Sequence, residues 1–169
     1  DRTTAEIALQ SALTGHLTLT TLHAGSACEV LGRLLDMGIE PYAIRSGLRA
    51  VIAQRLVRRL CPGCALPSTE EADLLGLPVT SSHVPVGCDD CGRTGYRGRM
   101  VLAELLRLES GELGPAILAR AEVQTLERLA VEAGMISRWR RACEAVEKGL
   151  TSAAEVRRVL GVGIGAVNG

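Results

Sequence analysis

The sequence predicts a layered α/β domain that carries a four-cysteine insertion and ends in a helical part. Helical periodicity in residues 1–60 is interrupted by one strand-like stretch. Two Cys-x-x-Cys pairs then follow, separated by 23 residues, and from residue 111 onward the pattern is helical throughout. We therefore expect three segments: an α/β core over 1–60, an insertion over 61–99, and a return strand with a helical subdomain over 100–169.

The composition argues against a nucleic-acid binder, a membrane-spanning protein and a secreted disulfide-rich protein. The 169 residues are 47% hydrophobic with zero net charge, so there is no overall attraction to nucleic acid or anionic lipid. Phe is absent and there is one Trp, which leaves no stacking platforms for single-stranded nucleic acid. No apolar run reaches the ~20 residues of a membrane span. Six cysteines without a signal peptide suit a reducing cytosol, and Cys28 and Cys143 are expected to be small buried apolar groups. The chain begins at Asp1 on a helix start, and we expect a further segment to precede it.

The start of the sequence predicts a helix followed by a strand. Thr3 and Glu6 form a capping-box pattern, and the mostly apolar helix that follows stops at Gly15. Residues 16–22 alternate apolar and β-branched positions, which predicts a strand. His23 falls just beyond the predicted end of that strand, in a turn.

Two more helices are predicted before the cysteines. Ser26 and Glu29 form a second capping box, which opens a helix ending at Gly38. Pro41 begins another helix with one apolar face. Residues 54–60 contain basic and apolar residues in alternation. They lead into the first cysteine pair as a strand or a helix end.

The cysteine spacing predicts a metal site. Two Cys-x-x-Cys knuckles at this separation can wrap a tetrahedral Zn²⁺ as four thiolates, and with no fifth donor nearby the site would be structural. The alternatives are disulfides, free thiols or a redox-active pair. A redox-active pair needs one reactive Cys-x-x-Cys at the start of a helix, whereas this sequence has two matched pairs around a loop. The predicted zinc ligands are Cys61, Cys64, Cys88 and Cys91.

After the insertion we expect one strand and four helices. Residues 100–108 read as a strand returning to the sheet, although the run could also open a helix. Thr151 or Ser152 would cap the last helix, and a glycine-rich tail would fray. Trp139 would be a half-buried anchor or an exposed partner contact. The predicted helices cover 112–121, 123–133, 136–148 and 152–160.

Several stretches resemble the secretion ATPases of type II secretion and type IV pilus assembly. They are Asp1–Ala8, Ala12–Leu17 with Thr21–His23, Arg33–Gly38, Ala53–Cys61, Cys88–Arg99 with its Thr-Gly-Tyr-x-Gly-Arg run, and Gly134–Met135 followed by Gly149–Thr151. The resemblance spans about residues 1–160 in order and spacing. It implies the C-terminal part of a RecA-like P-loop ATPase domain.

The resemblance also implies site residues. His16 and His23 fall in the family's histidine box, near the nucleotide phosphates; read from the residues alone, each would simply bond to backbone. The intact protein would bind ATP and Mg²⁺. This sequence has no Gly-x-x-x-x-Gly-Lys-Ser/Thr, since its one lysine, Lys148, precedes Gly-Leu. We therefore expect the isolated chain to be inactive as an ATPase.

Five arginines lie close to the knuckles in sequence. They could offset the charge of a tetrathiolate, form a basic rim for nucleic acid, or complete a nucleotide site. Among them we favour Arg55 for a role at the nucleotide. The five are Arg55, Arg58, Arg59, Arg97 and Arg99.

The resemblance implies a homo-hexameric motor. It would lie in the cytoplasm, peripheral on the inner membrane, and act through inner-membrane platform proteins without binding nucleic acid. Two alternatives come from the cysteine pairs: a stand-alone zinc-ribbon interaction module without a nucleotide role, and a zinc-ribbon nucleic-acid binder.

Overall fold

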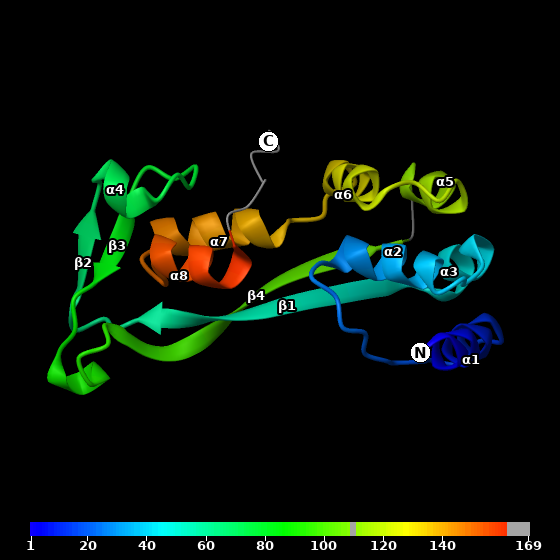
Figure 1. Cartoon of the computed structure of the whole chain (residues 1–169), viewed down its shortest axis with the longest axis horizontal. Coiled ribbons are helices and arrows are strands. Elements are labelled where there is room, and N and C mark those ends of the chain that lie inside the picture. Colours follow the sequence, from blue (N-terminus) through cyan, green and yellow to red (C-terminus); the bar gives the residue numbers. More distant parts are fainter. Residues whose placement is uncertain (109–110, 162–169) are drawn as a thin grey trace. The chain divides into compact units, whose positions relative to one another are not determined.

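The computed structural model describes residues 1–108 and 111–161, which form two compact units (Figure 1). Unit 1 contains residues 1–53 and 104–136, and unit 2 contains residues 54–103 and the chain from residue 137 on. None of the helices described is long and apolar enough to cross a membrane. The division into three segments stays a prediction.

The fold is mixed α/β with two small sheets. Long strands β1 (Ala50–Leu60) and β4 (Tyr96–Arg107) run side by side as one two-stranded ribbon, and β2 (Ala65–Ser68) pairs with β3 (Ser82–Pro85) (Figure 1). The stretch before the first cysteine pair is thus a strand, and the return strand after the second pair is confirmed.

A bulge interrupts the ribbon at Gly98. At one end the Leu108 N–H donates to Arg49 O, and at the other the Cys61 N–H donates to Gly95 O. Between these two bonds β1 advances twelve positions and β4 thirteen, so β4 carries one extra residue. Gly98 has a φ of +75°, the left-handed conformation of a bulge glycine, and nothing lies within 4 Å of a Cβ built there.

Helices of unit 1 surround one aliphatic core. They are α1 (Arg2–Leu13), α2 (Ala27–Asp36), α3 (Pro41–Gly47), α5 (Leu113–Leu118) and α6 (Val123–Glu132). Fully buried side chains at their contacts are Leu31, Ile44, Leu113, Ile117 and Leu126.

The predicted starts of these helices are confirmed for α2 and α3 and wrong for α1. Ser26 caps α2 by accepting from the Glu29 N–H, and Pro41 begins α3, both as predicted. The prediction that Thr3 caps the first helix is wrong. Asp1 does so, accepting from the Thr4 N–H at 2.8 Å, because a helix beginning at residue 2 leaves that amide without a partner in its own first turn.

The predicted strand over residues 16–22 is wrong for this structure. The stretch has no regular hydrogen-bonded structure, and Leu17 and Leu19 are 90% and 87% exposed. Alternation favours an extended chain, but a strand also needs a neighbour that accepts and donates its backbone hydrogen bonds. Among the described residues nothing pairs with this segment.

Unit 2 packs helices against its half of the ribbon. These are the single-turn α4 (Glu71–Leu74), α7 (Arg138–Glu147) and α8 (Ala153–Leu160), with a 3₁₀ turn over Asp89–Cys91. Ser152 caps α8, and the predicted tail beyond residue 161 lies outside the described residues. Trp139 is half-buried against the core, which agrees with the prediction of a half-buried anchor. The core centres on Val57, Leu102, Val146 and Val156.

The turn between α7 and α8, together with the first turn of α8, covers the free edge of β1. The Leu60 N–H donates to Leu150 O, the Arg58 N–H donates to Glu155 Oε1, and Thr151 Oγ1 donates to Arg58 O. A two-stranded ribbon has free edges on both strands, and these contacts satisfy backbone groups of one of them.

Candidate metal centre

The β2–β3 hairpin brings the two cysteine pairs together. Strand β2 begins directly after Cys64, and β3 ends at Pro85, shortly before Cys88. Ala65 pairs with Pro85 in the antiparallel register, so the hairpin closes the 23-residue spacer at its base. From the other side, the Cys61 N–H bonds across the ribbon to Gly95 O.

The four sulfurs form a compact cluster. All four Sγ atoms lie within 4.8 Å of one another, and three of the pairs, Cys88–Cys91, Cys61–Cys88 and Cys64–Cys91, are 3.8, 3.9 and 3.9 Å apart. Four sulfurs about 2.3 Å from a tetrahedral zinc ion would lie about 3.8 Å from each other. Disulfide sulfurs would be about 2.05 Å apart. The spacing fits metal ligands and is too long for S–S bonds.

Main-chain amides point at the cysteine sulfurs. The Cys88 and Gly95 N–H groups donate to Cys91 Sγ, both at 3.2 Å, and the Gly87 N–H donates to Cys64 Sγ at 3.3 Å. The Cys88 amide, with that of Gly95, lowers the pKa of Cys91 to about 6. Desolvation raises the pKa of Cys64 to about 11. Amide donors of this kind favour the thiolate form that ligates metals.

Two glycines make this geometry possible. Gly95 has a φ of +75°, and a Cβ there would lie 2.4 Å from Pro85 Cβ. Gly87 has a φ of +104°, and its Cβ would lie 2.6 Å from Arg93 O. Each position therefore demands both the left-handed backbone and the absence of a side chain.

A buried ionic network connects β1 to α8, and the sequence analysis missed it. Glu155 is fully buried and binds the guanidinium groups of Arg58 and Arg158. Burial disfavours its charged form, but the hydrogen bonds from Arg158 and Arg58 outweigh burial and hold the pKa of Glu155 at about 2. The position of Glu155 three residues after Ser152 indicates only a helix cap, in which the Ser152 side chain accepts from the Glu155 amide, and gives no sign of the two arginine partners.

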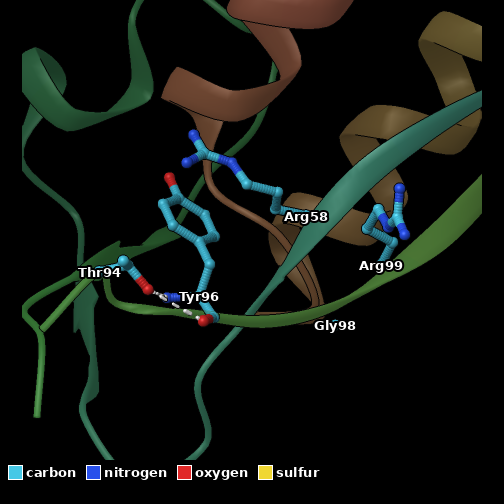
Figure 2. A pocket seen from close by; sticks show the side chains of 5 residues that line it. All are labelled: Arg58, Thr94, Tyr96, Gly98 and Arg99. Carbon is cyan, nitrogen blue, oxygen red and sulfur yellow. Dashed lines mark hydrogen bonds between the residues drawn. The ribbon is translucent and has the colours of Figure 1, made fainter. Parts of the chain in front are cut away.

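An open pocket of about 350 Å³ lies on the ribbon near this network (Figure 2). The Arg58 guanidinium stacks 4.0 Å from the centre of the Tyr96 ring, and the Tyr96 hydroxyl bonds to Ser152 Oγ at 2.6 Å. Figure 2 shows Arg99 apart from Arg58, with Thr94 bonded to the Tyr96 backbone. The lining residues are Arg58, Thr94, Tyr96, Gly98 and Arg99.

The predicted nucleotide-site residues lie in both units. His16 and His23 are exposed in unit 1, where Thr14 Oγ1 is 3.1 Å from His16 Nδ1 and Arg33 donates to His23 O. Arg55 belongs to unit 2, and its Nη1 donates to Gln54 O at 3.1 Å. Their nucleotide roles stay predictions.

Acidic side chains occupy the amino end of α2. The Ala27 N–H donates to Glu104 Oε1 at 2.6 Å, and the Gly25 N–H donates to Glu29 Oε2 at 2.6 Å. Glu104 is 1% exposed on β4, and the sequence analysis missed it as well. A buried carboxylate at a helix amino terminus is stabilised by the amide donors and the helix dipole.

Comparison with known proteins identifies relatives along nearly the whole chain. Residues 1–158 match the model of a family described as type II/IV secretion system protein. The chain is 46% identical over 135 residues to a putative type II secretion system protein E of Escherichia coli, covering 76% of this chain and 27% of the relative. It is 42% identical over 163 residues to the type II secretion system protein E of Klebsiella pneumoniae, covering 94% and 32%.

A pilus protein is also similar. The type IV pilus assembly ATPase PilB of Myxococcus xanthus is 38% identical over 165 residues, covering 92% of this chain and 29% of the relative. The chain thus spans about a third or less of the length of each of these three relatives.

Proposed function

Because this chain belongs to the type II/IV secretion system protein family, we propose that it forms the C-terminal part of a motor ATPase that drives secretion or pilus assembly. The observation that carries the proposal is the family match over residues 1–158, which includes the histidine box and both cysteine pairs. The relative named as a pilus assembly ATPase supports ATP hydrolysis as the activity of the intact protein.

In this proposal the four cysteines hold a structural Zn²⁺. Four thiolates fill a tetrahedral shell and leave no position for a reacting water, so the ion would stabilise the fold. The insertion between the pairs has few buried apolar side chains, Leu77 and Val79, and both pack into the core of unit 2. Metal binding would therefore supply folding free energy to the cysteine loops, which this core does not reach.

The chain's contribution to the nucleotide site would come from side chains. The amide donors of Gly25 and Ala27 at the amino end of α2 are already bonded to carboxylates. That leaves the exposed imidazoles of His16 and His23 as candidate phosphate contacts in unit 1, with Arg55 as a further cation. ATP and Mg²⁺ would be bound by the intact protein, since this sequence has no Walker A motif.

The extended segment 16–22 supports a RecA-like core in the intact protein. Its leucines Leu17 and Leu19 are almost fully exposed, although the segment alternates as a strand does. We propose that it joins the sheet of a RecA-like domain, pairing with part of the length that the relatives have and this chain does not span.

The assembled motor would be a homo-hexamer on the cytoplasmic face of the inner membrane, working through membrane platform proteins. The neutral overall charge supports a protein partner over nucleic acid.

A chimera tests the function. The N-terminal part of the Klebsiella relative, up to the start of the match, is joined to this chain, and phosphate release from ATP is measured. We expect the chimera to hydrolyse ATP, the isolated chain to be inactive, and His23→Ala to lower kcat of the chimera. Cys143→Ser serves as the control. A folded, ATP-binding chimera without turnover would contradict the proposal.

A further inference from the structure

Charged side chains hold the turn that carries His23. Residues 23–26 link the extended segment to α2 and belong to no helix or strand. Arg33 donates to His23 O, and the Gly25 N–H donates to Glu29 Oε2 at 2.6 Å. A Cβ at Gly25 would lie 2.4 Å from that carboxylate oxygen, so a side chain at this position would displace it.

The most distant contact to this turn comes from Glu104 on β4. The Ala27 N–H, where the turn joins α2, donates to Glu104 Oε1 at 2.6 Å. Glu104 is 1% exposed and Ala27 is fully buried, which leaves water little access to this bond. The Ser26 cap does not serve the same amide, because its side chain accepts from the Glu29 N–H. The turn is thus fastened by a carboxylate 77 residues away in the sequence.

A carboxylate is a stronger acceptor than the Ala27 amide requires. Burying a charge costs free energy, and the neutral amide oxygen of a glutamine could accept the same hydrogen bond. A charge-assisted hydrogen bond is shorter and about twice as strong as a neutral one. Glu104 therefore restrains the backbone of the turn more firmly than a neutral acceptor would.

His23 depends on that restraint for its position. Its side chain is exposed, so packing does not fix it, and the backbone of the turn decides where the imidazole can reach. Functional side chains need their supporting contacts to hold them within about 0.5 Å of the productive geometry.

We propose that Glu104 is a positioning residue, which holds the turn in the conformation in which His23 meets the nucleotide phosphates. This rests on the proposed nucleotide role of His23 and adds the residue that fixes its backbone. Glu104 itself is buried and would touch neither ATP nor the reacting atoms.

A double-mutant cycle in the chimera separates positioning from stability. Glu104→Gln keeps the shape of the side chain and removes its charge. It should lower kcat about tenfold and change KM for ATP by less than about twofold. In a His23→Ala chimera the same substitution should lower kcat by less than about twofold, because the residue that Glu104 positions is gone. Equal losses of kcat in the two backgrounds would show a merely structural role and overturn the proposal.

Two further variants complete the cycle. Glu132→Gln makes the same charge change in unit 1 at an exposed ion pair with Arg128, and should leave kcat within about twofold in both backgrounds. Glu29→Gln weakens the same turn at a half-buried residue, and it replaces Glu104→Gln in the cycle if that variant does not fold.

Amide hydrogen exchange in the 169-residue chain tests the restraint without ATP. Measured by NMR, exchange at Ala27 and Gly25 should become about tenfold faster in Glu104→Gln. The Leu48 amide is the reference, because it bonds to Ile44 O at the end of α3, away from the turn, and its exchange should not change. Unchanged exchange at Ala27, or an equal acceleration at Leu48, would overturn the proposal.

The two proposals can fail separately. A wild-type chimera that binds ATP without turnover counts against the proposed function, and the exchange result then decides the role of Glu104 by itself. An active chimera in which Glu104→Gln lowers kcat but His23→Ala does not would overturn the positioning role and leave ATP hydrolysis standing.

Discussion

Glu155 Oε2 accepts two hydrogen bonds from one guanidinium, from Arg58 Nε at 2.9 Å and from Arg58 Nη2 at 2.7 Å. Ninety-seven residues separate the two side chains, and the contact ties the end of β1 to the first turn of α8. The Glu155 side chain is fully buried, whereas the Arg58 side chain is 43% exposed. The buried carboxylate is therefore paired with a guanidinium that keeps part of its hydration. This lowers the desolvation cost of the ion pair.

Replacing Glu155 with Gln should lower the free energy of unfolding by about 2 kcal/mol, because charge-assisted hydrogen bonds from two arginines are lost inside the fold. Urea unfolding measures the change. Glu144→Gln is the control, since its pair with Arg140 is long, at 3.6 Å, and exposed, and should matter by less than about 0.5 kcal/mol. Equal effects of the two substitutions would contradict the assigned role of the network.

The same network predicts a pH dependence. The pKa of Glu155 is held at about 2 in the folded chain, against about 4.3 in an unfolded one. A depressed pKa adds stability that is fully present above the unfolded pKa and disappears as the pH falls toward 2. The difference in unfolding free energy between wild type and Glu155→Gln should therefore shrink from pH 6 to pH 2. Loss of any bound metal at acid pH would affect both chains and cancel in the difference. A constant difference would disprove the assignment.

Gly95 and Gly98 offer a matched pair, because both have a φ of +75°. Gly98→Ala should cost only the left-handed penalty, about 1–2 kcal/mol, since nothing lies within 4 Å of its new Cβ. Gly95→Ala adds a 2.4 Å contact with Pro85 Cβ, and should cost at least about 1 kcal/mol more. Thermal and urea unfolding compare them, and equal losses would argue against the close packing beside the cysteine cluster.

The local signals in the sequence predicted much of the fold. Ser26, Pro41 and Ser152 start helices where capping rules place them, and the cysteine spacing correctly anticipated one four-sulfur cluster. These features depend on residues close in sequence, or on a spacing that is specific in itself.

The features that the sequence analysis predicted wrongly or missed depend on contacts between residues far apart in the sequence. Residues 16–22 have the pattern of a strand but no partner among the described residues. The roles of Glu104 and Glu155 come from contacts 77 and 97 residues away, which no local pattern reveals. The bulge at Gly98 likewise follows from register across two strands.

Metal content tests the central claim most directly. Elemental analysis of the freshly purified, reduced chain should find about one zinc ion per chain, and Cys88→Ser should fall well below that while Cys143→Ser keeps it. A wild-type chain that is folded and free of zinc, or a Cys88→Ser chain with unchanged zinc, would contradict the account of a zinc-stabilised part of a secretion motor.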